Sequence, residues 1–327
     1  MIAFIFPGQG SQKVGMGRAL ADAYPEARAV FDEADAALRP SLGPGLEVCP
    51  LSTLIFDGPE SQLTLTENAQ PAILTVSIAA CRVLAARGIT PAFVAGHSLG
   101  EYSAHVAAET MTFADAVRIV RRRGMYMQEA VPVGEGSMAA ILGLDAETVT
   151  RACEEAAQGD VVSPANINGA GQVVIAGATA AVERAGERAK ALGARRVIPL
   201  AVSAPFHCAL LKPAEARLEP ELRALAVRAP RVPVVANVDA EPKRDAVSAI
   251  DALVKQVSAP VRWEQVVRRL ASEGVTTYVE VGPGTVLSGL VKKIHKEAVV
   301  CNFAAPDDLA AVEEALASSK FEVRSGK

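Results

Sequence analysis

The chain has 327 residues, enough for one large α/β domain or two ordinary ones, and 50% of them are hydrophobic. A formal net charge of −4 argues against a protein that coats nucleic acid, because binding the phosphate backbone needs a basic excess. Five dispersed cysteines without a CxxC pair favour reduced thiols in a cytoplasmic protein, and they argue against a disulfide framework or a zinc site.

The amino-terminal third alternates short β-like runs with helical runs, which is typical of an α/β protein. The expected elements, in chain order, are a strand at 2–6, helices at 25–38 and 69–87, a strand at 93–95 and one long helix from about 100 to 123. The first apolar run is short and ends at Pro7 and Gly8, which argues against a signal peptide. No apolar stretch is expected to reach the length of a membrane span, so we predict no membrane partner.

The middle of the chain has a different order of predicted strands and helices. It predicts a strand at 137–142, a helix at 146–157, strands at 161–167 and 172–176, a helix at 180–192 and a strand at 196–201. This βαββαβ order is the ferredoxin-like pattern. Strands at 277–281 and 299–303 with helices at 286–293 and 307–318 then resume the α/β order. We therefore predict a large α/β-hydrolase-like domain with a parallel sheet, residues 1–130 and 199–327, and an inserted ferredoxin-like domain, residues 131–198.

The pentapeptide G-H-S-L-G at 96–100 follows an expected strand and precedes an expected helix. A serine on such a tight turn needs a strained backbone, and flanking glycines remove the clashes. The following helix directs its free N–H groups and the positive end of its dipole at a developing oxyanion. The pattern predicts that Ser98 is a nucleophile, and an ordinary turn is the alternative.

A general base for Ser98 has to come from the four histidines of the chain. His97 is adjacent to the serine, so its side chain is expected to point away. His105 lies two turns into the following helix and is expected to pack beneath the site, whereas His295 lies among lysines at an expected solvated helix end. Elimination leaves His207, just beyond an expected strand end, as the predicted base.

The acid of a hydrolase-type triad is not evident. It is expected between the serine and the histidine, where Asp115, Asp145 and Asp160 lie, but none of the three is at a convincing strand end. We therefore expect a backbone carbonyl or an amide to orient the base.

Two further segments have either a structural role alone or a role in the active site. The glycine-rich turn F-P-G-Q-G-S-Q at 6–12 is either a β-to-α connection or a second wall of an oxyanion hole, since glycines let a backbone N–H approach a ligand. Three arginines at 121–123 are expected at the end of the helix that follows Ser98, where arginines complement the helix dipole and face solvent.

Taken together, these segments resemble the malonyl-CoA:acyl carrier protein transacylase family, the acyltransferases of bacterial fatty-acid synthesis. The matching motifs, in the order of the family, are FPGQGSQ at 6–12, GHSLGEYSA at 96–104, RGMYMQEAV at 123–131, SPANING at 163–169, QVVIAG at 172–177, FHCALLKPA at 206–214 and EVGPGTVLSGL at 280–290. They span nearly the whole chain. The same fold serves as the acyltransferase domain of polyketide synthases.

The resemblance implies a role for each matching residue. Ser98 matches the nucleophile and His207 its base. Gln9 and Leu99 match the positions whose backbone N–H groups form the oxyanion hole. Arg123 matches the arginine that binds the free carboxylate of the malonyl group, which a planar guanidinium grips through two hydrogen bonds.

Four more positions carry roles through the resemblance. Gln256 matches the residue whose backbone carbonyl orients the histidine, which agrees with the missing acid. Asn166 and Asn168 match polar residues of the small domain that line the cleft. Phe206 resembles the malonyl-selecting form of its motif.

The resemblance further implies a ping-pong transfer of malonyl from malonyl-CoA, a substrate, to the phosphopantetheine thiol of acyl carrier protein, by a monomer without metal or bound cofactor. Coenzyme A and carrier protein are both acidic, so basic residues are expected at the entrance to the site. The candidates are Lys190, Arg195, Arg196, Lys292, Lys293 and Lys296.

Three other functions are compatible with parts of the pattern. A polyketide acyltransferase acting in trans would use the same residues. A serine esterase or thioesterase shares the nucleophile turn but leaves Arg123 and the inserted pattern unexplained. A non-catalytic module that binds carrier protein has no need to retain Ser98, His207 or Arg123.

Overall fold

We describe a computed structural model of the chain over residues 1–39, 49–132, 134–202 and 204–325, with side chains as far as residue 317. Its larger sheet has the strand order β10-β9-β1-β2-β7-β8. The strands are β1 (Ile2–Phe6), β2 (Phe93–Gly96), β7 (Val234–Val235), β8 (Pro242–Lys243), β9 (Thr277–Val281) and β10 (Val299–Phe303). β1 pairs in parallel with β2 and β9, β9 with β10, and β2 with β7, while β8 is antiparallel to β7.

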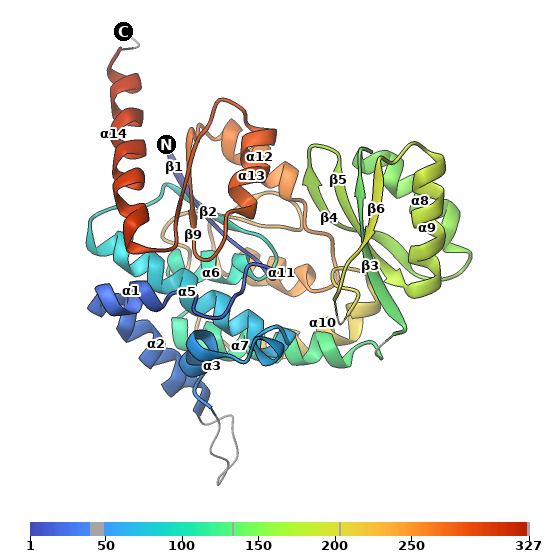
Figure 1. Cartoon of the computed structure of the whole chain (residues 1–327), viewed down its shortest axis with the longest axis horizontal. Helices are drawn as coiled ribbons and strands as arrows, with labels where there is room; N and C mark the ends of the chain where they lie inside the picture. Colours follow the sequence, from blue (N-terminus) through green and yellow to red (C-terminus); the bar gives the residue numbers. More distant parts are fainter. Residues whose placement is uncertain (40–48, 133, 203, 326–327) are drawn as a thin grey trace.

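Helices pack around this sheet (Figure 1). They are α1 (Arg18–Ala23), α2 (Pro25–Leu38), α3 (Leu51–Asp57), α4 (Glu60–Leu63), α5 (Thr66–Ala86), α6 (Gly100–Ala107), α7 (Phe113–Glu129), α10 (Lys212–Arg223), α11 (Ala246–Gln256), α12 (Trp263–Ser272), α13 (Val286–Ile294) and α14 (Leu309–Ser325), with short 3-10 turns at Ala209–Leu211 and Pro306–Asp308. The expected strands at 2–6, 277–281 and 299–303 and the helix at 25–38 have the bounds predicted for them.

The helix α5 is more apolar than the sequence analysis allowed. It has 21 residues and a mean hydropathy of 1.5, so by length and composition it is able to cross a membrane. The expectation that no apolar stretch reaches the length of a membrane span is therefore wrong. However, 78% of its most apolar window is buried inside the protein. Helices α2, α6 and α7 pack against it. That burial is typical of a core helix, which is apolar on all sides because neighbours cover all sides.

The smaller sheet forms a separate layer at one side of the molecule (Figure 1). Its strand order is β4-β5-β3-β6, and every pairing in it is antiparallel. The elements are β3 (Gly136–Leu142), α8 (Ala146–Ala157), β4 (Val162–Gly169), β5 (Gln172–Ala178), α9 (Thr179–Ala191) and β6 (Arg196–Pro199). α8 and α9 cover one face through a cluster that includes Ile141, Val149 and Val182. Mixed α/β architecture with a mostly parallel sheet is thus confirmed, together with a second, antiparallel sheet.

The long helix expected from Gly100 to Arg123 is wrong, because the segment forms two helices, α6 and α7. Glu109 has a φ of 59°, a left-handed conformation that ends a right-handed helix. The Thr112 side chain then accepts a hydrogen bond from the Asp115 N–H and caps α7. Arg123 therefore lies inside α7 and not at a helix end.

Candidate active site

Ser98 lies at the turn between β2 and α6, with a φ of 52°. Non-glycine residues rarely adopt this left-handed conformation, so the turn is strained. A Cβ on Gly96 would lie 1.9 Å from the carbonyl carbon of Gly100, and one on Gly100 would lie 2.0 Å from the oxygen of Phe6. Neither position accepts a side chain, which explains why this turn is bracketed by glycines.

Asn237, two residues after β7, supports the turn from the neighbouring strand. Its Nδ2 donates to the oxygen of Gly96 at 2.7 Å, and its Oδ1 accepts from the N–H of Ser98 at 2.8 Å. The side chain is fully buried. Both backbone groups of the strained turn are therefore paired without water. Asn237 was not predicted from the sequence, because the two-residue strand β7 that positions it was not predicted either.

The glycine-rich turn after β1 lies beside the Ser98 turn. β1 and β2 are parallel neighbours with Phe6 opposite Gly96, so both strands end at the same edge. A Cβ on Gly8 would lie 2.5 Å from the oxygen of His97, which shows how closely the two turns approach. Gln9 and Leu99 line the same cavity as Ser98. The two N–H groups assigned to an oxyanion hole thus belong to adjacent turns.

His207 is buried, and its Nε2 lies 2.6 Å from Ser98 Oγ. Its other ring nitrogen, Nδ1, lies 2.9 Å from the oxygen of Gln256 and 3.2 Å from that of Ala259. Because carbonyl oxygens only accept, Nδ1 carries the proton, and Nε2 accepts from the serine hydroxyl. Burial, reinforced by repulsion from Arg123, lowers the pKa of His207 to about 3, so the imidazole is neutral at physiological pH.

The three aspartates considered for a triad are engaged elsewhere. The Asp115 side chain accepts from the Thr112 hydroxyl and pairs with Arg118. Asp145 caps α8, and Asp160 pairs with Arg184. The partners of the His207 Nδ1 are backbone carbonyls, the arrangement expected when no acid was found.

The other histidines lie near the site or outside it. The Nε2 of His97 contacts the Oδ1 of Asn168 at 2.9 Å, and His105 is buried with its Nδ1 3.3 Å from the hydroxyl of Thr110. His295, expected in solvent, is half-buried and contacts the hydroxyl of Tyr278 at 3.1 Å.

Arg123 extends from α7 to the nucleophile and is only 2% exposed. Its Nη1 donates to the Gln70 side chain at 2.7 Å, and its Nη2 donates to the Gln256 side chain at 2.8 Å and to Ser98 Oγ at 3.2 Å. Gly124 permits this placement, since a Cβ there would lie 2.7 Å from the backbone of Glu67 on α5. Within the described part of the chain, the hydrogen-bond partners of this cation are all neutral. The Glu101 carboxylate attracts this cation from the far side of the Gln256 amide but is not one of its hydrogen-bond partners. A buried guanidinium without a directly bound carboxylate is costly, so the site favours an incoming anion.

Glu101 lies close to the nucleophile, in the first turn of α6, and is 0% exposed. Its Oε2 accepts from the backbone N–H of Asn237 at 3.0 Å and from the Gln256 side chain at 2.9 Å. Burial raises its pKa to about 7, although these two hydrogen bonds lower it. Glu101 was not predicted from the sequence. Its position three residues after Ser98, in the first turn of the helix that follows, was the available signal.

The cavity at Ser98 has a volume of about 430 Å³ and is lined from both sheets. The larger unit contributes Arg123 and His207, whereas β4 contributes Asn166. Phe206 also lines it, directly before the base. Asn168 reaches the site indirectly, through its hydrogen bond to His97. The structure thus brings all of the predicted site residues to one place.

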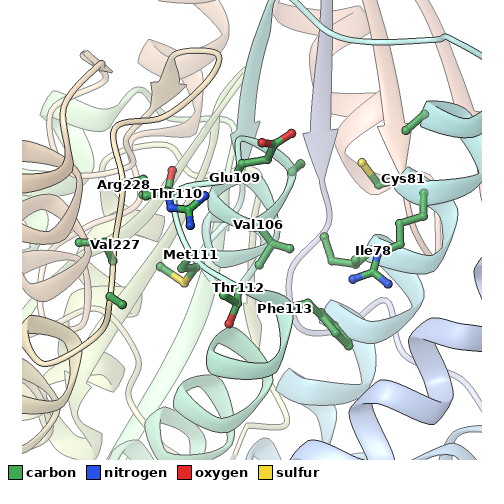
Figure 2. A pocket seen from close by; sticks show the side chains of 14 residues that line it. Ile78, Cys81, Val106, Glu109, Thr110, Met111, Thr112, Phe113, Val227 and Arg228 are labelled. Atoms are coloured by element: carbon green, nitrogen blue, oxygen red, sulfur yellow. The ribbon is translucent and has the colours of Figure 1, made fainter.

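A second cavity, of about 600 Å³, lies between α5, the α6–α7 loop and residues 226–228 (Figure 2). Apolar side chains such as Ile78, Val106 and Phe113 form much of its wall (Figure 2). Its one thiol, Cys81, has a pKa raised to about 12 by burial, so it is not ionised at neutral pH. No serine or histidine lines this cavity among the described residues, which makes the smaller cavity the candidate site.

Comparison with known proteins identifies the family. The family described as "Acyl transferase domain" matches residues 3–316, a range that contains every residue of the site. This chain belongs to the acyltransferase family. It is 50% identical over 296 residues to the malonyl CoA-acyl carrier protein transacylase of Bacillus subtilis (strain 168), with 90% of each chain covered. It is also 50% identical over 313 residues to the protein of that name from Escherichia coli (strain K12), covering 95% of this chain and 98% of that one.

Solved structures agree with this acyltransferase assignment. An acyl carrier protein S-malonyltransferase from Vibrio cholerae is similar at a TM-score of 0.91 and 46% identity, with 95% of this chain and 99% of that chain covered. A malonyl-transacylase in complex with a type II PKS acyl-carrier protein is similar at 0.90 and 46% identity, with 94% and 97% covered. The family resemblance inferred from the sequence is confirmed.

Proposed function

We propose that this acyltransferase moves the malonyl group from malonyl-CoA to the phosphopantetheine thiol of an acyl carrier protein, through an ester on Ser98. The observation that carries the proposal is the position of Arg123, a buried cation 3.2 Å from the nucleophilic oxygen, whose hydrogen-bond partners in the described residues are neutral. A malonyl group on Ser98 would supply the missing carboxylate. The names of the relatives point to the same acyl group.

The proposed chemistry takes place in two transfers. The Nε2 of His207 accepts the proton of Ser98 as the serine oxygen attacks the thioester carbonyl of malonyl-CoA. The backbone N–H groups of Gln9 and Leu99, aided by the amino-terminal end of α6, stabilise the oxyanion. His207 then returns the proton to the departing thiolate of coenzyme A. In the second transfer His207 takes the proton of the carrier thiol, whose sulfur attacks the ester carbonyl, and the bond to Ser98 Oγ breaks as His207 gives the proton back to the serine oxygen. Each group invoked belongs to the chain, so we propose a reaction without a resident metal or cofactor.

Selection of the acyl group follows from the same geometry. Arg123 pairs with the malonyl carboxylate throughout, whereas an acetyl group forms no ion pair with it. Gln70 and Gln256 fix the plane of the guanidinium, so its bidentate face is preset. Phe206 narrows the cavity beside His207, where we propose that it disfavours branched acyl groups.

We propose that residues 131–198 form an inserted ferredoxin-like domain and that residues 1–130 and 199–327 form the α/β-hydrolase-like domain. The βαββαβ order and the antiparallel sheet support this division. Asn166 would then line the cleft from the inserted domain, and Asn168 would contact the site through its hydrogen bond to His97. We place the enzyme in the cytoplasm as a monomer that serves fatty-acid synthesis, with no membrane or nucleic-acid partner.

The carrier protein is proposed to dock where exposed cations border both sheets. Lys190, Arg195, Arg196, Lys292, Lys293 and Lys296 are all exposed. Arg195 and Lys293 line one hollow from opposite units. Charge reversal at Lys293 is expected to raise the KM for carrier protein and to leave acylation of Ser98 unchanged. Unchanged kinetics would remove this residue from the interface.

The test is intact-protein mass spectrometry after brief incubation with equal malonyl-, acetyl- and methylmalonyl-CoA, followed by addition of holo acyl carrier protein. The expected result is a malonyl adduct that is absent in Ser98→Ala and that moves to the carrier. Hydrolysis of the thioesters with an unmodified carrier would indicate a thioesterase instead. Neither adduct nor turnover would indicate a binding module.

A further inference from the structure

Glu101 is buried next to the reacting groups, but the proposed mechanism does not use it. Its Oε1 has no hydrogen-bond partner in the described residues, and its Oε2 accepts both of its hydrogen bonds. Burying a carboxylate with one unpaired oxygen costs free energy, so a function that offsets this cost is expected. The two residues that donate to it, Asn237 and Gln256, each form a hydrogen bond with the backbone of Ser98.

The first connection runs through Asn237. Glu101 Oε2 accepts from the backbone N–H of Asn237, and the side chain of Asn237 contacts both ends of the strained turn, at Gly96 and Ser98. Fixing this backbone segment therefore fixes the position from which the Ser98 oxygen attacks.

The second connection runs through the Gln256 side chain, which is also 0% exposed. Its Nε2 donates to Glu101 Oε2 at 2.9 Å and to the oxygen of Ser98 at 2.8 Å, while its Oε1 accepts from Arg123 Nη2 at 2.8 Å. The carboxylate accepts only and the guanidinium donates only, so the amide has one orientation that satisfies both. Loss of the acceptor at position 101 would leave one buried Nε2 hydrogen of Gln256 unpaired, and the bond to the Ser98 oxygen would then be the only one that holds Nε2 in place.

We propose that Glu101 is a positioning residue, which sets the serine turn through Asn237 and the carboxylate-binding arginine through the Gln256 side chain. The part that concerns malonyl rests on the proposed function. Glu101 itself touches no reacting atom. Its effect is transmitted to Ser98 and Arg123 by four hydrogen bonds, of which three are buried and the one from the Ser98 N–H is partly buried.

The experiment compares Glu101→Gln with Glu101→Met. Both variants remove the charge and preserve the length of the side chain, but only glutamine retains an acceptor oxygen. The matched controls are the same changes at Glu280, another buried carboxylate, which accepts two backbone N–H groups at the start of α13 away from the site. The readouts are melting temperature, the rates of malonyl and acetyl transfer to Ser98, and labelling of Ser98 by a fluorophosphonate.

We expect Glu101→Gln to keep all rates within about threefold, because the acceptor remains. Glu101→Met is expected to lose about tenfold or more in malonyl transfer, since two buried donors lose their partner, with a smaller loss for acetyl. Glu280→Met should lower the melting temperature comparably and keep wild-type rates. Equal losses in both Glu101 variants would assign the effect to charge and overturn the proposal, as would a folded Glu101→Met enzyme with wild-type rates.

The labelling readout separates this proposal from the proposed function. If the wild-type enzyme reacts with fluorophosphonate but transfers no malonyl, the proposed function fails, and the effect of Glu101→Met on labelling still decides whether Glu101 sets the serine turn. If Glu101→Met does not fold, Gln256→Met takes its place. Malonyl-to-acetyl selectivity is then expected to fall about fivefold or more, as Arg123 loses one partner, and unchanged selectivity would overturn the arginine part.

Discussion

The six-stranded sheet holds Ser98 at the end of β2, where buried polar side chains from α6, α7 and α11 surround it. The strands of the four-stranded sheet contribute only Asn166 of β4 and Met138 of β3 to the described lining of the same cavity. We call the six-stranded sheet with its helices the first region and the four-stranded sheet with its helices the second region. At the site, His97 of the first region forms a hydrogen bond with Asn168 of the second, and the backbone of β4 pairs with Val261, which follows Gln256. The first region fixes the reacting atoms.

This difference indicates a division of work. Ser98, His207, Arg123 and Gln256 in the first region are linked to one another by hydrogen bonds, which is the preorganisation that acyl transfer requires. The second region adds surface to the cavity and contacts the residue next to the nucleophile. Substitutions in the first region should therefore affect the chemical step, and substitutions in the second should affect binding of substrate.

The largest effect is expected for His207→Ala. Removal of the base leaves the Ser98 hydroxyl without an acceptor, and we expect acylation by malonyl-CoA to fall by about 10⁴-fold or more. Rapid-quench measurement of the acylated enzyme reports this rate directly. His295→Ala, which removes a half-buried histidine beside Tyr278, is the control and should acylate normally. A His207→Ala enzyme with a loss below tenfold would assign the base to another group.

Arg123→Ala is expected to have the next largest effect. It leaves the malonyl carboxylate unpaired in the cavity, at a cost of about 2–5 kcal/mol, which is about 30- to 5,000-fold in malonyl transfer. Acetyl transfer should fall far less, because no ion pair is lost. Arg122→Ala is the matched control, since that neighbour is exposed and pairs with Glu221. Equal losses for the two acyl groups would contradict the role of Arg123.

Much of this could be predicted from the sequence, because it depended on local patterns. The nucleophile turn is marked by glycines that are needed for close backbone approach, and the βαββαβ segment shows its periodicity directly. The break between α6 and α7 was missed because it depends on one left-handed residue, Glu109, and on the cap at Thr112. Asn237 was missed because it lies more than a hundred residues from its partner Ser98, and only the parallel pairing of β2 with β7 brings the two together.

Asn168→Ala tests the smaller region. It removes a single hydrogen bond to His97, and we expect the KM for malonyl-CoA to rise about two- to tenfold with kcat nearly unchanged. Steady-state kinetics with both substrates give this comparison, and thermal unfolding provides the stability control. A fall in kcat with constant KM would contradict the proposed division, since it would place part of the preorganisation in the smaller sheet.

The smallest effect on the acylation rate is expected when the pH is lowered. The size of this effect distinguishes a buried His207 imidazole from a solvent-exposed one. An imidazole with the ordinary pKa of about 6.5 would lose about 25-fold in its neutral fraction between pH 7 and pH 5, and acylation would fall in proportion. The pKa of His207 is lowered to about 3, so it remains neutral across this range and kcat/KM for acylation should change less than about twofold. Glu101, with its pKa raised to about 7, does take up a proton there, but its Oε2 remains an acceptor, as in Glu101→Gln. A steep acid limb that persists in Glu101→Gln would show that solvent reaches the His207 ring, and the preorganised network around Ser98 would then have to open before reaction.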